Sequence, residues 1–95
     1  MSLRFAWDSN KALQNSGKHD GVTFEEASTV FYDPLAYIFD DDEHTGEEYR
    51  ELIIGHSRRN RLLIVAFTER NDVVRIISAR KVNLAEQKIY EQTSR

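Results

Sequence analysis

The stretch from Arg61 to Arg80 constrains the fold of this chain more than any other part of the sequence. It contains two apolar runs, residues 62–68 and 73–79, on either side of the polar segment 69–72. Both runs are rich in Val and Ile, which suit a pleated and buried surface. Two such runs joined by a short polar connection predict a β-hairpin. We therefore expect a buried hairpin at the centre of the structure.

Capping residues and apolar spacing predict the elements around this hairpin. Asp8 is a suitable N-cap for a first helix, which Gly17 would end. Thr23 and Glu26 fit a capping box at the start of a second helix, which would end before Pro34. The expected elements, in chain order, are a strand over residues 3–7, a helix over 9–16, a helix over 24–32, strands over 35–39 and 49–57, the hairpin, and a helix over 82–93.

This order predicts an α+β fold in which an antiparallel β-meander carries helices on one face. The other face would then be free for a ligand or a partner. Gly55 suggests a bulge in its strand. The residues expected to face the core are Phe24, Ala27, Val30 and Phe31 in the second helix, and Leu84, Ile89 and Tyr90 in the last.

Length and composition place the chain among globular proteins of one domain, residues 1–95. It has no cysteine, so a disulfide framework and thiolate chemistry are excluded. It has neither an apolar run long enough to span a membrane nor an apolar signal-peptide core, and we expect a cytoplasmic protein. The sequence has no glycine-rich phosphate loop, and we expect no cofactor.

The charges are unevenly divided along the chain. Residues 1–49 carry three basic and eleven acidic side chains, whereas residues 50–95 carry ten basic and five acidic ones. A basic half is typical of proteins that bind a polyanion such as nucleic acid, although uneven surface charge also arises by chance.

Four arginines of the hairpin are the first candidates for chemistry: Arg61, Arg70, Arg75 and Arg80. Guanidinium groups match phosphate geometry and stabilise charge that develops during phosphoryl transfer. Arg61 and Arg80 flank the two strands, so we expect their side chains to reach one groove at the end of the sheet. The alternative is that these arginines pair with Asp and Glu across the sheet.

Two further groups contain histidine. Lys18 and His19 lie in a predicted turn, where a proton shuttle could stand beside a phosphate ligand, or where both could be ordinary surface residues. His44 lies in the acidic segment 40–48, between carboxylates that would raise its pKa. This segment resembles a calcium loop but has Thr45 where that loop needs glycine, and we expect no metal site.

An ordered set of short motifs resembles the BrnT family of toxins over about residues 5–91. The motifs are Phe5-x-Trp7-Asp8-x-x-Lys11-x-x-x-Asn15-x-x-Lys18-His19-x-x-Val22-x-Phe24-Glu25-Glu26-Ala27, Val30-Phe31-x-Asp33-Pro34, His44-x-x-Glu47-Glu48-x-Arg50, Ile54-Gly55-x-Ser57, Arg61-Leu62-Leu63, Thr68-Glu69-Arg70 and Arg75-Ile76-Ile77-Ser78-Ala79-Arg80.

The resemblance implies the toxin half of a type II toxin–antitoxin pair, with a fold similar to the RelE ribonucleases. It implies RNA cleavage without a metal, by attack of the ribose 2′-OH on its own 3′-phosphate. It also implies a BrnA-like antitoxin, a 2:2 complex, and contact with operator DNA only through that antitoxin.

Under this resemblance, Arg61 and Arg80 would stabilise the phosphate, with Arg70 and Arg75 as second choices. The candidates for proton transfer, with no order among them, are Lys18, His19, His44 and Glu48. Lys18 could also bind phosphate. The alternative function is a non-enzymatic adaptor that uses the same sheet face to bind a partner chain.

Overall fold

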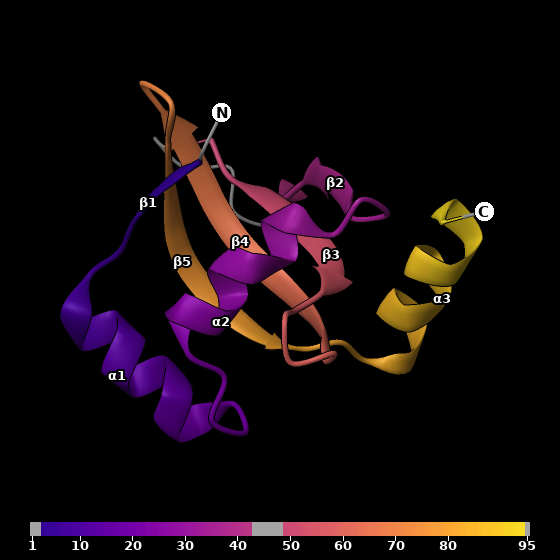
Figure 1. Ribbon diagram of the computed structural model, residues 1–95, viewed down its shortest axis with the longest axis horizontal. Coiled ribbons are helices and arrows are strands. Elements are labelled where there is room, and N and C mark those ends of the chain that lie inside the picture. The colour runs from indigo at the N-terminus through magenta and orange to yellow at the C-terminus, as the bar shows by residue number, and fades with distance from the viewer. Residues whose placement is uncertain (1–2, 43–48, 95) are drawn as a thin grey trace.

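The computed structural model describes residues 3–42 and 49–94, in which five strands form one sheet accompanied by three α-helices and a 3₁₀ helix (Figure 1). The order along the chain is the predicted one, with the 3₁₀ helix added. The elements are β1 (Arg4–Ala6), α1 (Ser9–Lys18), α2 (Phe24–Thr29), η1 (Val30–Tyr32), β2 (Tyr37–Asp40), β3 (Glu51–His56), β4 (Leu62–Arg70), β5 (Val73–Lys81) and α3 (Leu84–Thr93).

The predicted hairpin is formed by β4 and β5, the two longest strands. Its turn is shorter than expected, because the strands extend to Arg70 and from Val73 and leave Asn71 and Asp72 to make the connection. Both residues have positive φ, 53° and 65°. Two consecutive left-handed residues are typical of the type I′ turn, whose twist matches that of the flanking strands.

The sheet is mixed, so the predicted purely antiparallel meander is only partly correct. Strands β2 to β5 do form an antiparallel meander, but β1 pairs in parallel with β5, and the strand order is β1-β5-β4-β3-β2. A strand of three residues carries no sequence signal for its direction or its partner. β1 is fixed instead by tertiary packing, since the Phe5 ring lies 5.3 Å from the ring of Phe31.

Helices cover both faces of the sheet, which corrects the expectation that they all lie on one. The larger core cluster joins α2 and η1 to one face, through Phe24, Ala27 and Val30 packed against Ile53 and Val65. A smaller cluster on the opposite face contains Tyr90 of α3 with Ile54 and Ile64. Figure 1 shows α1 and α2 together on one side and α3 apart from them.

Local predictions for the helices on the first face are largely confirmed. Asp8 caps α1 by accepting a hydrogen bond from the Lys11 N–H, and the core side of α2 is as expected. Gly17 does not end α1, which runs to Lys18. Buried Asn15 joins α1 to the sheet, because its side chain bonds both the N–H and the carbonyl of Ala79 in β5.

Two other expectations are wrong. In α3, Leu84 and Ile89 are 66% and 37% exposed, and only Tyr90 is buried. Gly55 pairs with Leu63 in regular register and makes no bulge. Its lack of a side chain is needed for close approach, because a Cβ there would lie 3.1 Å from the Asp33 carboxylate.

The bulge lies in the hairpin instead, where the register shifts beside Ala66 and Phe67. Before it, Val74 and Ile76 face the larger core cluster; after it, Ala79 does. The extra residue therefore turns Arg80 to the opposite face, where it pairs with Ile64. No helix among the described residues has the length and apolar character needed to cross a membrane.

Candidate functional site

The four hairpin arginines do not form one cluster. Arg70 and Arg75 are exposed in the half of the hairpin near its turn. Arg61 and Arg80 lie at the other end, as expected, but they do not share a groove. Arg61 contacts α2, on the face that α1 and α2 cover, whereas Arg80 contacts α3 on the opposite face.

Arg61 is bound by the buried carboxylate of Glu26 in a two-pronged ion pair. Its Nε lies 2.9 Å from Oε2, and its Nη2 donates to Oε1. The hydrogen bond from Arg61 is the largest cause of a lowered Glu26 pKa; burial opposes it, and the Ser57 hydroxyl adds to it at 2.6 Å from Oε2. Arg59 is 3.9 Å from Oε1.

This ion pair explains why the predicted capping box is incomplete. Thr23 does cap α2 by accepting the Glu26 N–H at 3.0 Å. The Glu26 side chain, however, turns away from the start of its helix to bind Arg61 and Ser57. A charged partner forms a stronger hydrogen bond than a backbone N–H, so the tertiary contact takes precedence over the local one.

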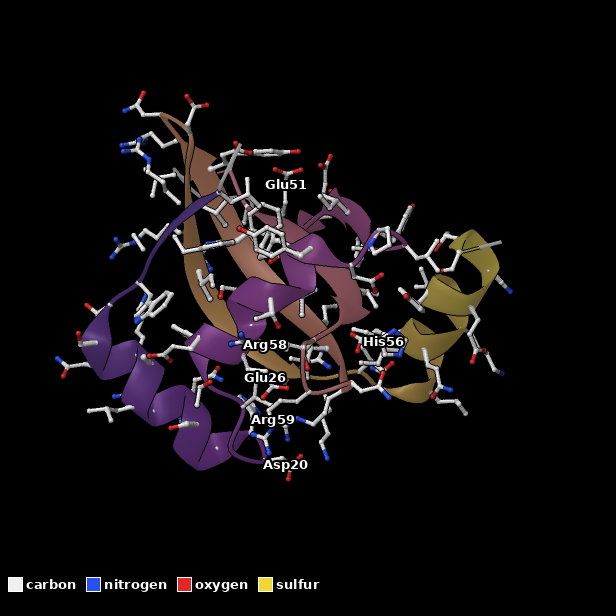
Figure 2. All side chains as sticks on the ribbon, in the orientation of Figure 1. Asp20, Glu26, Glu51, His56, Arg58 and Arg59 are labelled. Carbon is white, nitrogen blue, oxygen red and sulfur yellow. The ribbon has the colours of Figure 1, made fainter. Side chains whose placement is uncertain are left out.

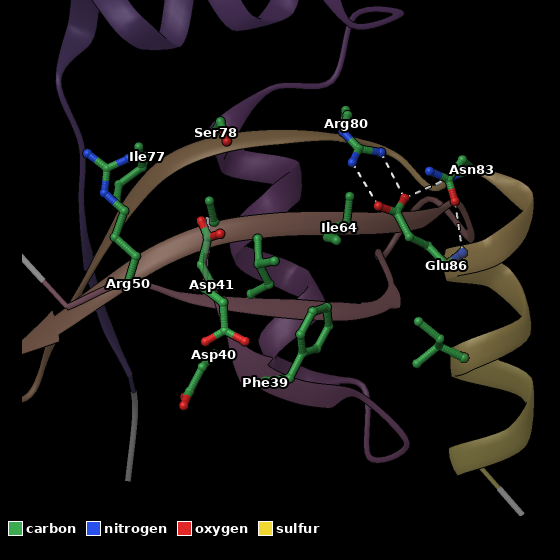
Figure 3. Close-up of a pocket in the computed structure, with 14 residues that line it drawn as sticks. Phe39, Asp40, Asp41, Arg50, Ile64, Ile77, Ser78, Arg80, Asn83 and Glu86 are labelled. Carbon is green, nitrogen blue, oxygen red and sulfur yellow. Dashed lines mark hydrogen bonds and ion pairs between the residues drawn. The ribbon is translucent and has the colours of Figure 1, made fainter. Parts of the chain in front are cut away.

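Arg80 pairs with Glu86 of α3 through two hydrogen bonds of 2.8 Å (Figure 3). Glu86 also completes a capping box with Asn83, the N-cap of α3. This pair stands at the side of a cavity of about 600 Å³ on the face of the sheet that α3 covers in part, and we call it the open-face cavity. Its lining includes Phe39, Arg50, Leu52, Ile64 and Ile89. Figure 3 shows Arg50 and Arg80 at separate positions along this cavity.

A different group of basic residues lies at the end of β3 and in the loop after it. The chain here reads His56-Ser-Arg-Arg-Asn-Arg61, and we call His56, Arg58, Arg59 and Arg61 the loop site. Arg58 and Arg59 are exposed, and the side chain of His56 is 44% exposed. Figure 2 shows Arg58 and Arg59 beside Glu26, and His56 next to α3.

Three side chains hold three consecutive residues of this loop. Two of them belong to α2, and the third belongs to the residue that follows η1. The Asp33 carboxylate accepts the His56 N–H at 2.7 Å, and the Glu26 carboxylate accepts the Ser57 hydroxyl. The Thr29 hydroxyl accepts the Arg58 N–H at 2.8 Å. A loop that is held at three successive residues, through two backbone N–H groups and one side chain, presents its exposed side chains in a defined geometry.

The His56 ring is held from one side. Its Nδ1 lies 3.1 Å from the hydroxyl of Tyr90, and that hydroxyl donates to Asp33 Oδ2 at 2.7 Å. The two rings meet edge to face, with centroids 5.2 Å apart. His56 and Arg58 also line one cavity of about 600 Å³, together with Thr29, Tyr32, Asp33 and Ser57.

Lys18 and His19, two of the predicted proton-transfer residues, are not brought into this arrangement. Lys18 is exposed at the end of α1, and His19 is its half-buried C-cap. Their turn is nevertheless close to the loop site, because Arg61 Nη1 donates to the carbonyl of Asp20 at 3.2 Å. His44 and Glu48 lie outside the described residues.

The sequence alone did not point to His56, Glu26 or Asp33 as functional residues. His56 is followed closely by three arginines, a local signal that could have pointed to it. The roles of the two carboxylates depend on partners 31 and 23 residues away along the chain, which no local pattern encodes. Over residues 3–42 and 49–94, no three His, Asp or Glu side chains are grouped so that they could hold a metal ion.

Comparison with known proteins identifies relatives of this chain. Residues 7–86 match the model of the family described as "Ribonuclease toxin, BrnT, of type II toxin-antitoxin system". The crystal structure of the Brucella abortus ribonuclease toxin BrnT is similar in fold, with a TM-score of 0.65 and 22% sequence identity; the match covers 86% of this chain and 99% of that one. No curated protein matches. The expected likeness to the RelE ribonucleases stays a prediction.

Proposed function

This chain belongs to the BrnT family of ribonuclease toxins of type II toxin–antitoxin systems, and from that membership we propose that it cuts RNA internally without a metal ion. The ribose 2′-OH would attack its own 3′-phosphate. Such a reaction needs a group that takes the proton of the 2′-OH and cations that stabilise the phosphate as it gains charge.

One observation carries the choice of site: His56 and Arg58 line the same cavity. An imidazole changes charge near neutral pH and can therefore move protons at physiological pH. A guanidinium in the same cavity can bind the phosphate on which the imidazole acts. We place the cleavage reaction at the loop site for this reason.

The arginines then have different roles. Arg58 and Arg59 are exposed and would contact the phosphate backbone of the RNA. Arg61 would act as a positioning residue, since its guanidinium is already bound to Glu26. Arg80, with Arg50 at the open-face cavity, would contact RNA beyond the cleaved bond.

A type II toxin has a cognate antitoxin. We propose that this partner is BrnA-like, that the complex has 2:2 stoichiometry, and that operator DNA is contacted only by the antitoxin.

The test is cleavage of a defined RNA by purified protein in excess EDTA. We expect cleavage by the wild-type chain and a loss of about 10² to 10⁴ in rate for His56→Gln, the usual contribution of proton transfer. Arg58→Ala should lose about 10²-fold, because one donor to the developing charge is removed. Arg4→Ala is the matched control. It removes an exposed arginine from the edge strand β1, which β5 and β4 separate from β3.

The outcomes separate the alternatives. Cleavage that needs added metal would refute the metal-independent reaction. Loss of cleavage in Arg80→Ala, with His56→Gln fully active, would move the reaction to the open-face cavity. A folded wild-type chain that cuts no RNA but still binds its antitoxin would support the adaptor function instead.

A further inference from the structure

Three side chains from separate parts of the chain form a hydrogen-bonded series that ends at His56. Asp33 follows η1, Tyr90 lies in α3, and His56 ends β3. The Tyr90 hydroxyl is 2.7 Å from Asp33 Oδ2 and 3.1 Å from His56 Nδ1. The Tyr90 ring is buried against Ile54 and Ile64, so its hydroxyl is held in place.

The direction of each hydrogen bond follows from the state of Asp33. Burial alone would raise the pKa of this carboxyl, but the backbone N–H groups of His56 and Leu35 and the Tyr90 hydroxyl together lower it. Asp33 is therefore ionised at neutral pH and can only accept hydrogen bonds. Burial and the bond to Asp33 also raise the pKa of Tyr90, which keeps its single hydrogen.

Because that hydrogen is donated to Asp33, the Tyr90 oxygen can only accept a bond from His56 Nδ1. A neutral imidazole that donates from Nδ1 has its lone pair on Nε2. We infer that Asp33 and Tyr90 are positioning residues that keep the His56 proton on Nδ1, so that Nε2 is the general base of the cleavage reaction. This inference rests on the proposed function, and it assigns to His56 the role of base rather than acid.

The reaction balances with water as the only further reactant. Nε2 takes the proton of the 2′-OH while the 2′-oxygen forms its bond to phosphorus. The bond from phosphorus to the 5′-oxygen breaks, and that oxygen takes a proton from water. His56 then returns its extra proton to solvent. The products are a 2′,3′-cyclic phosphate and a 5′-hydroxyl.

Other ionisable groups near the ring also bear on the pH dependence. The Asp33 carboxylate lies on the Nδ1 side of the ring, with Oδ2 at 3.7 Å from Nδ1. Arg58 and Tyr32 line the same cavity as His56, and the Tyr90 hydroxyl lies 3.1 Å from Nδ1. Of these four side chains, only Tyr90 is changed in the measurements below.

The first test is the tautomer of His56, measured by ¹⁵N NMR on the full chain labelled at histidine. The spectrum of His56→Gln assigns the signal among the three histidines of the sequence. We expect a neutral ring protonated at Nδ1 in the wild-type chain and a mixture of tautomers in Tyr90→Phe. Tyr37→Phe is the matched control, because it removes an exposed hydroxyl and keeps the ring that stacks on Phe39.

The second test is the pH dependence of cleavage. The acid limb of the rate profile should be present in the wild-type chain and absent from the residual activity of His56→Gln. Tyr90→Phe should retain the acid limb and lose about fivefold in kcat, the effect expected from one ordinary hydrogen bond. Imidazole added to a small-side-chain variant, His56→Gly, should restore part of the rate.

Each outcome is decisive. A neutral His56 protonated at Nε2 would overturn the positioning role of Asp33 and Tyr90, whether or not RNA is cut. An unchanged rate profile in His56→Gln would overturn the base assignment while leaving the ribonuclease function intact. If the wild-type chain cuts no RNA, the proposed function and the base role fail together, and the tautomer alone decides whether Asp33 and Tyr90 orient the ring.

Discussion

Replacing Arg61 with alanine tests what holds the loop site to the rest of the fold. The substitution removes both hydrogen bonds to Glu26 and the bond to the Asp20 carbonyl. It leaves a carboxylate that is only 4% exposed without its main partner. A buried charge that loses its counter-ion is among the most destabilising changes a protein can suffer.

The size of the effect follows from what remains around Glu26. Breaking a buried pair by removing one partner costs about 3 to 5 kcal/mol. Here Ser57 still donates at 2.6 Å and Arg59 is 3.9 Å away, so part of the charge stays compensated. We therefore expect Arg61→Ala to lower the free energy of unfolding by about 2 to 3 kcal/mol, or the melting temperature by roughly 10 to 20 °C for a chain of this size.

The assay is urea unfolding followed by circular dichroism, at several pH values. The pKa of Glu26 is lowered from its ordinary value of 4.5 in the folded chain. The stability that comes from its ionised form is therefore complete above about pH 4.5 and is lost as the pH falls below it. The difference between wild type and Arg61→Ala should shrink over that acid range.

A second variant, Glu26→Gln, separates the effect of the carboxylate charge from that of the shape of the side chain. Glu26→Gln removes the buried charge, so Arg61→Ala should cost less in that background, with a coupling of about 1 to 2 kcal/mol. If Arg61→Ala unfolds within about 0.5 kcal/mol of wild type at pH 7, the range of an ordinary surface substitution, the ion pair does not stabilise the fold as expected. A loss of equal size at pH 3 and pH 7 would refute the charge argument alone.

Three further changes should alter stability in the same assay. Gly55→Ala places a Cβ 3.1 Å from the Asp33 carboxylate and should cost about 1 to 3 kcal/mol by overpacking; an unchanged midpoint would mean that the contact is relieved without cost. Asn15→Ala leaves the buried backbone groups of Ala79 without partners and should cost about 3 kcal/mol, and a loss below 1 kcal/mol would show that water replaces the amide. Asp72→Gly, at a φ of 65°, should raise the unfolding free energy by roughly 0.5 kcal/mol, so a decrease would contradict the turn assignment.

The parts of the fold that were predicted correctly depend on neighbours in sequence. The hairpin, the Asp8 cap and the core side of α2 are all encoded within a few residues. The parallel pairing of β1 and the buried side of α3 depend on distant partners. Tyr90 rather than Leu84 is buried, and its hydroxyl bonds Asp33, 57 residues earlier in the chain.

The predicted groove between Arg61 and Arg80 failed for a specific physical reason. Strict alternation along β5 would put Arg80 on the same face as Val74 and Ile76, the face on which Arg61 binds Glu26. The bulge in the hairpin adds one residue and reverses the alternation beyond it. Bulges of this kind leave little trace in a run of apolar residues, so the error could not have been avoided from the sequence.

The loop site depends on the helical layer that faces it. Glu26 holds Ser57, Thr29 holds Arg58, and Asp33 holds His56. Because the three anchors bind different residues of the loop, losing one should displace its own partner most. Glu26→Gln should therefore impair RNA binding through the neighbouring arginines more than the pH dependence of cleavage. Tyr90→Phe acts on the Asp33 side and should change the pH dependence of cleavage more than RNA binding. Equal effects of both variants on KM and on the pH profile would mean that the loop moves as one unit.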